Sequence, residues 1–139
     1  AASPRGALEA PGELAGRKLA VAMRELKKRE GKETPGKGAF VCRKARQPSG
    51  PRYEVPSCAA VCVYSNLVKV AKKFLGTSGV KVASVATAFP SGLMPLDLKL
   101  KEVRRAAGDG ADEIEMVIDS GVFLAGDYNR VFEELAAVK

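Results

Sequence analysis

Three short apolar runs, each followed by an amphipathic helical pattern, constrain the fold of this chain more than any other feature. The runs cover residues 59–64, 80–89 and 113–118, and each has the length of a β-strand. Three consecutive β-α units with short connections indicate a parallel sheet with right-handed crossovers. The sequence therefore predicts an α/β protein. Its sheet belongs either to a doubly wound fold or to part of a TIM (β/α)8 barrel.

Motifs and length bear on this choice between a doubly wound sheet and a barrel. No G-x-G-x-x-G follows any of the three runs, so no motif supports a dinucleotide-binding fold. A complete barrel needs about 250 residues, and the 139 residues here would therefore make close to half of one. In either fold, ligands bind at the carboxyl ends of the strands. We predict these ends at Tyr64, residues 87–89, and Ile118 with Asp119.

The patterns after the three runs predict three helices with distinct apolar faces. Ser65 is placed to cap the first helix, and Asp127 is placed to cap the third. Lysines at positions 69, 72, 73, 99 and 101 fall on the faces predicted to be exposed. The residues predicted to face inward are Leu67, Val70, Ala71 and Phe74 in the first helix, Leu96, Leu100, Val103 and Ala107 in the second, and Val131, Phe132, Leu135 and Val138 in the third.

The N-terminal part of the chain differs from the rest in charge. Residues 1–52 hold 13 Lys and Arg against 5 Asp and Glu, a net charge of +8, whereas residues 53–139 hold 10 against 11, a net charge of −1. Residues 1–16 have the composition of a flexible lead-in, and the spacing predicts a helix over 14–30. Within this predicted helix, residues 24–30 carry too many charges to form a buried strand. We therefore predict a basic, partly flexible segment at 1–36 and a barrel-like part at 37–139, with a proline-glycine loop at 48–51.

The cysteine and histidine content limits which catalytic groups and metal sites this chain can have. The chain has three cysteines and no histidine, and histidine is the commonest general base and transition-metal ligand. Cys58 and Cys62 lie four residues apart without a second pair, so we expect buried thiols and no metal site. The odd number of cysteines favours a reducing compartment, the cytoplasm or an organellar matrix. No apolar run approaches the roughly 20 residues that span a membrane.

The third run carries acidic residues on an otherwise apolar strand. Alternation places Glu113, Glu115 and Asp119 on one face, and Ile114 and Met116 on the other. Burying carboxylates is costly unless they are paired or hydrogen-bonded, so their presence here indicates a site. The alternative interpretation is a half-exposed strand with a solvated acidic face.

Several of these segments resemble deoxyribose-phosphate aldolase. They read AAVCVY at 59–64, VASVATAFPSG at 82–92, DGADEI at 109–114 and MVID at 116–119, and a weaker resemblance covers 30–48. The resemblance implies a (β/α)8 barrel and a class I aldolase that uses no metal and no cofactor. Such enzymes reversibly cleave 2-deoxyribose 5-phosphate to glyceraldehyde 3-phosphate and acetaldehyde through a lysine Schiff base.

The resemblance also implies roles for three residues. Glu115 stands where the family has an aspartate that donates and accepts protons, Glu25 where it has a second active-site aspartate, and Cys62 at a cysteine near the substrate. The family's Schiff-base lysine lies on its sixth strand, and a lysine that tunes it lies on the seventh; both fall after the matched segment. A Schiff-base amine must be neutral near pH 7. The helix lysines named above are predicted to be exposed, where an amine stays charged. We therefore expect no lysine of these 139 residues to replace the Schiff-base lysine.

Two classes of function follow from these observations. The chain is either the N-terminal part of an aldolase, an aldehyde lyase that acts on a phosphorylated sugar or aldehyde once the lysine strands are supplied, or an inactive structural module of a larger assembly. A module of that kind could contact RNA through the basic segment. An unpaired edge beside Met116 invites association, so we expect a homo-oligomer, a complementary half or a larger complex as partner, and no membrane.

Overall fold

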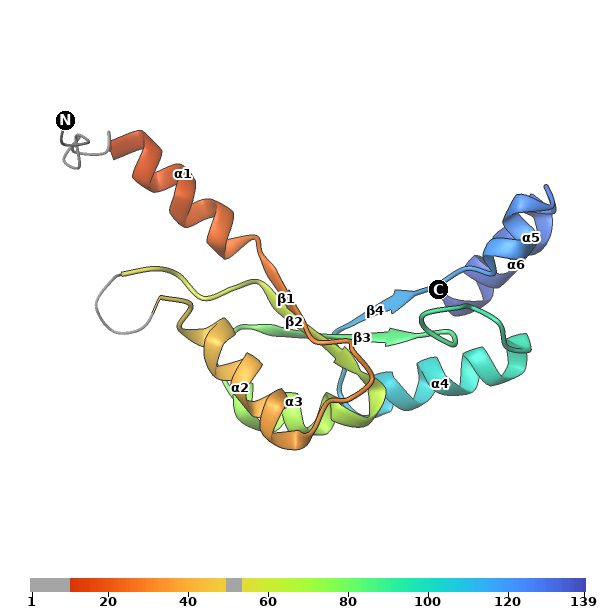
Figure 1. The fold of residues 1–139 in the computed structure, drawn as a ribbon, viewed down its shortest axis with the longest axis horizontal. Coiled ribbons are helices and arrows are strands. Elements are labelled where there is room, and N and C mark those ends of the chain that lie inside the picture. The colour runs from red at the N-terminus through yellow and green to blue at the C-terminus, as the bar shows by residue number, and fades with distance from the viewer. Residues whose placement is uncertain (1–10, 50–53) are drawn as a thin grey trace, which may run out of the picture.

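The computed structural model describes residues 11–49 and 54–139, which form four parallel strands and the helices that connect them (Figure 1). The strands are β1 (Glu25–Lys27), β2 (Ala60–Tyr64), β3 (Lys81–Ala86) and β4 (Glu113–Met116), and they lie in the order of the sequence. Each neighbouring pair is parallel. The predicted α/β class with consecutive β-α units is therefore confirmed.

The described helices either lie along one face of this sheet or extend away from its ends (Figure 1). They are α1 (Pro11–Ala22), α2 (Pro35–Arg46), α3 (Val68–Leu75, preceded by the 3-10 turn η1 at Ser65–Leu67), α4 (Leu96–Gly108), α5 (Ser120–Leu124) and α6 (Tyr128–Val138). In Figure 1, α2, α3 and α4 lie along one face, whereas α1 and the α5–α6 pair extend away at opposite ends. The opposite face, called the inner face below, carries no described helix. No helix in the described ranges is long and apolar enough to cross a membrane.

The main core lies between the sheet and helices α2 and α3. Alternation along β2 places Val61 and Val63 in this core, while Cys62 joins a smaller cluster on the inner face. Fully burying one valine contributes roughly 1.5–3 kcal/mol, so this layer holds the helices to the sheet. Cys58 and Cys62 are buried free thiols, as predicted, and Cys42 is a third. Helix residues in the main core include Cys42, Ala45, Val68, Ala71 and Leu75.

The first strand corrects the prediction for residues 24–30. This run was expected to continue a helix and to be too charged for a strand, but α1 ends at Ala22 and Glu25–Lys27 pair with β2 in the register Glu25↔Ala60. The charges are tolerated because β1 is an edge strand and its side chains stay partly exposed. Helix α1 also includes residues 11–16, which were expected to be a flexible lead-in. Residues 1–10 of that lead-in, and residues 50 and 51 of the predicted loop at 48–51, lie outside the described residues.

The helices bury partly different faces from those predicted. Phe74 is exposed because the buried stripe of α3 consists of Val68, Ala71 and Leu75. Phe132 is 70% exposed, because α6 turns Val131 and Glu134 inward instead. Lys99 was placed on an exposed face, yet its side chain is 1% exposed, and its Nζ lies 2.8 Å from Glu134 Oε2. An ion pair therefore takes the place of an apolar contact between α4 and α6.

Candidate active site

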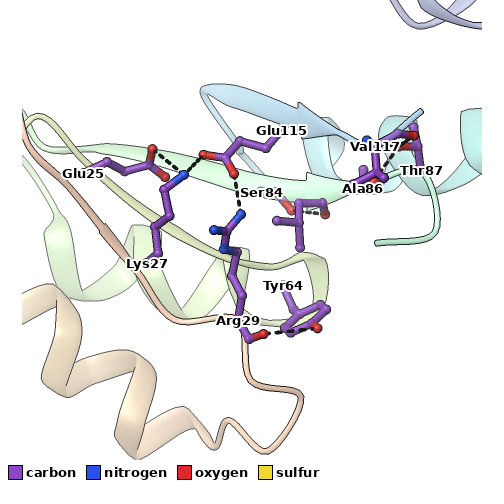
Figure 2. A network of polar contacts seen from close by, with 10 residues as sticks. Glu25, Lys27, Arg29, Tyr64, Ser84, Ala86, Thr87, Glu115 and Val117 are labelled. Atoms are coloured by element: carbon purple, nitrogen blue, oxygen red, sulfur yellow. Dashed lines mark hydrogen bonds and ion pairs between the residues drawn. The ribbon is translucent and has the colours of Figure 1, made fainter. Parts of the chain in front are cut away.

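Charged side chains from both edge strands meet over the inner face of the sheet. Figure 2 shows Lys27 of β1 between the carboxylates of Glu25 and Glu115. Lys27 Nζ lies 2.5 Å from Glu115 Oε1 and 3.3 Å from Glu25 Oε2. Arg29 Nη1 donates a hydrogen bond of 2.8 Å to Glu115 Oε2. β1 and β4 are not neighbours in the sheet, so these contacts require a sheet that curves toward its inner face.

The three site residues predicted from the sequence come together here. One carboxylate oxygen each of Glu25 and Glu115 and the Cys62 thiol lie within 4.8 Å of one another. They come from three different strands, because Glu25 is on β1, Cys62 on β2 and Glu115 on β4. Alternation in parallel strands aims all three at the inner face. Glu115 is therefore part of a polar cluster, whereas Glu113 on the same face of β4 stays exposed and pairs with Lys81 across 2.9 Å.

The positive charges of Lys27 and Arg29 keep Glu115 ionised. Burial alone raises the pKa of this carboxyl, but the hydrogen bonds with Lys27 and Glu25 and the charges of Lys27 and Arg29 outweigh burial and leave the pKa lowered. The same contacts raise the pKa of Lys27, chiefly through the hydrogen bond with Glu115. Glu115 is therefore a carboxylate and Lys27 an ammonium near neutral pH. An ammonium group is not nucleophilic, so Lys27 in this state does not form a Schiff base.

An aromatic wall holds Arg29 in place. The Arg29 guanidinium lies 5.1 Å from the centre of the Phe89 ring, within the range of a cation–π contact. Tyr64 packs edge-on against Phe89 with ring centres 5.8 Å apart, and its hydroxyl donates a 3.5 Å hydrogen bond to the carbonyl of Arg29. The guanidinium is therefore oriented toward Glu115 before any ligand binds.

The loop after β3 fixes the carboxyl end of β4. Thr87 is left-handed, with φ 62°, and its hydroxyl oxygen accepts a 2.6 Å hydrogen bond from the backbone N–H of Val117. Gly92 lies against the same segment, because an added Cβ would meet the carbonyl oxygen of Ile118 at 2.4 Å. These contacts hold the backbone two residues beyond Glu115, on the element that aims its carboxylate.

The side chains of Glu25, Cys62 and Glu115 are of types that can bind a metal ion. Here, however, the positive charges beside them are those of lysine and arginine side chains. The Lys27 ammonium and the Arg29 guanidinium already bind both Glu115 oxygens. Burial, with further contributions from Glu115 and Glu25, raises the pKa of the Cys62 thiol to about 12, whereas a metal needs the thiolate. The arrangement therefore suits proton transfer better than metal binding.

Sequence reasoning missed Lys27 and Arg29. Their signal was present, because Glu25, Lys27 and Arg29 are spaced two apart and would share one face of an extended segment. The prediction of a helix over residues 14–30 hides this two-residue spacing, because positions two apart do not share a face of a helix. Once β1 is recognised, the same alternation places Lys27 and Arg29 on the face that carries Glu25.

Comparison with known proteins identifies the fold. No family model matches the sequence. The deoxyribose-phosphate aldolase of Caldicellulosiruptor saccharolyticus is 47% identical over 79 residues, covering 57% of this chain and 36% of that enzyme. The corresponding enzyme of Agrobacterium fabrum is 36% identical over 107 residues, covering 76% of this chain and 39% of that enzyme. This chain is homologous to part of deoxyribose-phosphate aldolase.

Structural comparison agrees with this relation to deoxyribose-phosphate aldolase. A crystal structure assigned as that enzyme from Coccidioides immitis superposes with a TM-score of 0.75 at 26% identity, covering 86% of this chain and 44% of the other. The four strands therefore match about half of an aldolase barrel, which decides between the two predicted folds. The chain spans only 36–39% of the length of the two curated deoxyribose-phosphate aldolases.

We expect the Cys62 thiol to react very slowly with iodoacetamide in the folded chain. With a pKa of about 12, about one thiol in ten thousand is ionised at pH 8, against roughly a quarter for an ordinary cysteine. Alkylation followed by peptide mass mapping should show Cys62 modified at least about a thousandfold faster in urea. Equal rates in buffer and in urea would contradict the buried, carboxylate-flanked position of this thiol.

Proposed function

We propose that this chain supplies the N-terminal half of a deoxyribose-phosphate aldolase active site. The observation that supports the proposal is the convergence of Glu25, Cys62 and Glu115 from three strands on the inner face of a half barrel. Glu115 is the proton donor and acceptor in this proposal. Glu25 and Cys62 contact the substrate, a phosphorylated sugar or the aldehydes formed from it.

The reaction would proceed in four steps. A neutral lysine amine adds to the C1 aldehyde of 2-deoxyribose 5-phosphate and loses water to give an imine. A base then takes the proton of the C3 hydroxyl, and the C2–C3 bond breaks to release glyceraldehyde 3-phosphate and leave an enamine. Protonation of the enamine carbon and hydrolysis release acetaldehyde. Proton transfers of this kind contribute about 10²–10⁴-fold in rate.

Glu115 fits the proton-transfer role because of its ionisation and position. Its lowered pKa keeps it in the basic form near pH 7, and each oxygen keeps a free lone pair beside its contact with Lys27 or Arg29. The amine must come from elsewhere. Lys27 is an ammonium held by Glu115, and Lys99 is buried against Glu134, away from solvent.

Complementation in trans tests this proposal. The strands that follow the matched segment of the Caldicellulosiruptor saccharolyticus enzyme are expressed separately and mixed with this chain. We expect the mixture to cleave 2-deoxyribose 5-phosphate, whereas either part alone does not. A complex that forms but does not turn over the substrate would contradict the proposal.

A pair of matched variants isolates the role of Glu115 in the complemented enzyme. We expect Glu115→Gln to lower kcat about a hundredfold or more, because the amide cannot exchange protons. Glu113→Gln is the control on the same strand, since Glu113 pairs with Lys81 at an exposed position, and it should retain most of the activity. Equal losses in both variants would remove Glu115 from the proton-transfer role.

Exposed apolar side chains on the projecting helices support the alternative function, a structural module. Leu19 and Met23 on and just after α1, and Leu124 and Phe132 in the α5–α6 pair, are all more than half exposed. Patches of this kind mark interaction sites. A stable complex with unrelated subunits or RNA, formed without any gain of aldolase activity on complementation, would favour this alternative.

A further inference from the structure

Helices α2 and α3 carry a positive charge as large as that of the whole chain. α2 holds four cations and α3 holds three, and neither helix holds a carboxylate. Their net charge of +7 equals the formal net charge of all 139 residues, so the remaining residues sum to zero. The two helices lie side by side (Figure 1), and Arg46 Nη1 donates a 3.3 Å hydrogen bond to the carbonyl of Phe74. The seven cations, called the basic face below, are Lys37, Arg43, Lys44, Arg46, Lys69, Lys72 and Lys73.

Most cations of the basic face have no carboxylate partner. Lys69 pairs with Asp109, and Lys72 pairs with Asp112. The end of a helix carries about half a negative charge, which offsets little of the three cations in the last turn of α2. The cations that are exposed and have no carboxylate partner in residues 11–49 and 54–139 are Lys37, Arg43, Lys44, Arg46 and Lys73.

A hollow beside the last turn of α2 suits a phosphate group. Among the described residues it is lined by Arg43, Arg46 and Gln47, and its volume is about 470 Å³. Guanidinium groups bind phosphate oxygens through paired hydrogen bonds, and side-chain amides also donate to them. The hollow is larger than one phosphate needs, so a phosphate can enter it together with its sugar.

An aromatic ring lies on the same surface of α2. Phe40 is 63% exposed. It precedes Arg43 and Lys44 by three and four residues, the spacings that place side chains on one face of a helix. Exposed aromatic rings stack on unpaired bases, and cations beside them hold the phosphates between those bases. Cations interleaved with an exposed ring are therefore suited to a single strand.

We propose that the basic face binds the phosphate backbone of a single-stranded nucleic acid, with phosphates at Arg43, Arg46 and Lys73 and a base stacked on Phe40. Between Lys37 and Arg46, α2 rises by about 14 Å at 1.5 Å per residue. A ligand with one phosphate would leave most of this row unused, whereas a nucleic acid strand follows it.

The position of the basic face makes it independent of the aldolase site. α2 and α3 pack on the middle strands β2 and β3, so the face does not depend on what borders β1 or β4. It also lies on the side of the sheet opposite the inner face that carries Glu115, as Figures 1 and 2 show. Nucleic-acid binding and the proposed catalytic function can therefore be tested separately.

Fluorescence anisotropy of the intact chain with a fluorescein-labelled single-stranded RNA of about 20 nucleotides tests the proposal. In about 50 mM salt we expect a dissociation constant in the micromolar range. The logarithm of the binding constant should fall with the logarithm of the salt concentration with a slope of about −3 to −4, because each of roughly five phosphate contacts contributes about −0.7. Absence of binding at this salt concentration would overturn the proposal. Binding to vesicles of phosphatidylcholine and phosphatidylserine but not to the RNA would also overturn it.

Two matched double variants locate the contact. Arg43→Gln with Lys73→Gln removes two exposed cations of the basic face, and Lys101→Gln with Arg104→Gln removes two exposed cations of α4. The first pair should reduce the salt slope by about 1.4 and raise the dissociation constant at least about tenfold in 50 mM salt. The second pair should leave the dissociation constant within about threefold. Equal effects of the two pairs would overturn the proposal, because binding would then follow net charge alone.

Phe40→Ala separates base stacking from phosphate binding. We expect this variant to raise the dissociation constant about tenfold without changing the salt slope. An unchanged dissociation constant would overturn the assignment to a single strand. The variant with Arg43→Gln and Lys73→Gln should also retain full aldolase activity on complementation in trans. Loss of RNA binding and of complementation together in that variant would contradict the separation of the two sites.

Discussion

Glu134→Ala is expected to lower the free energy of unfolding by about 3–5 kcal/mol. The substitution removes the partner of Lys99, whose side chain is 1% exposed and pairs with Glu134 across 2.8 Å. A buried ammonium without its carboxylate loses the attraction that offset its desolvation. Domains of this size have a total free energy of unfolding of about 5–15 kcal/mol. Losing 3–5 kcal/mol of it should therefore leave only part of the chain folded in buffer, so that the cooperative unfolding transition is much reduced.

Urea unfolding at one fixed protein concentration measures this effect, since association would otherwise shift the midpoint. Lys101→Ala is the control on the same helix, because its pair with Asp97 is exposed and should contribute less than about 1 kcal/mol. The double variant Lys99→Met with Glu134→Leu should recover most of the stability, because apolar residues of similar volume replace the buried pair. A Glu134→Ala chain as stable as the Lys101→Ala control would show that α6 does not pack on α4 in this way.

Strands β2, β3 and β4 were predictable from the sequence because their apolar runs have the length and β-branched content of buried strands. The strand β1 was not, because an edge strand that faces an open surface carries charges at Glu25 and Lys27 and lacks an apolar run. The curvature that joins the two edges could not be inferred from any single segment. It depends on how all four strands pack together.

Helix faces were predicted less well because helix docking depends on distant residues. The pattern around Leu96 and Leu100 predicts an exposed Lys99, and only the docking of α6 brings Glu134 to it from 35 positions away. Phe132 shows the converse case, an apolar residue of a regular pattern that stays exposed. Both differences arise from one tertiary contact between α4 and α6.

The site was predictable only in part. The pattern on β4 marks Glu115 as one of several acidic residues on a single face, and the resemblance to the aldolase family singles it out together with Glu25 and Cys62. The ion pairs of Glu115 with Lys27 and Arg29 come from the structure alone. They matter for mechanism because they lower the pKa of Glu115 and raise that of Lys27.

The central proposal is that this chain supplies the acid–base side of an aldolase site and that the Schiff-base amine comes from elsewhere. Two of its described lysines are held by carboxylates, Lys27 by Glu115 and the buried Lys99 by Glu134. Lys27, the one that reaches Glu115, has a raised pKa and is held as an ammonium, whereas an imine forms from a neutral amine.

Reductive trapping tests this claim most directly. The chain alone is incubated with acetaldehyde or 2-deoxyribose 5-phosphate, reduced with borohydride and analysed by intact mass. We predict an unmodified mass for this chain, both alone and when mixed with the complementary half, whose own lysine should carry the adduct in the mixture. A stoichiometric adduct on one lysine of this chain would contradict the account.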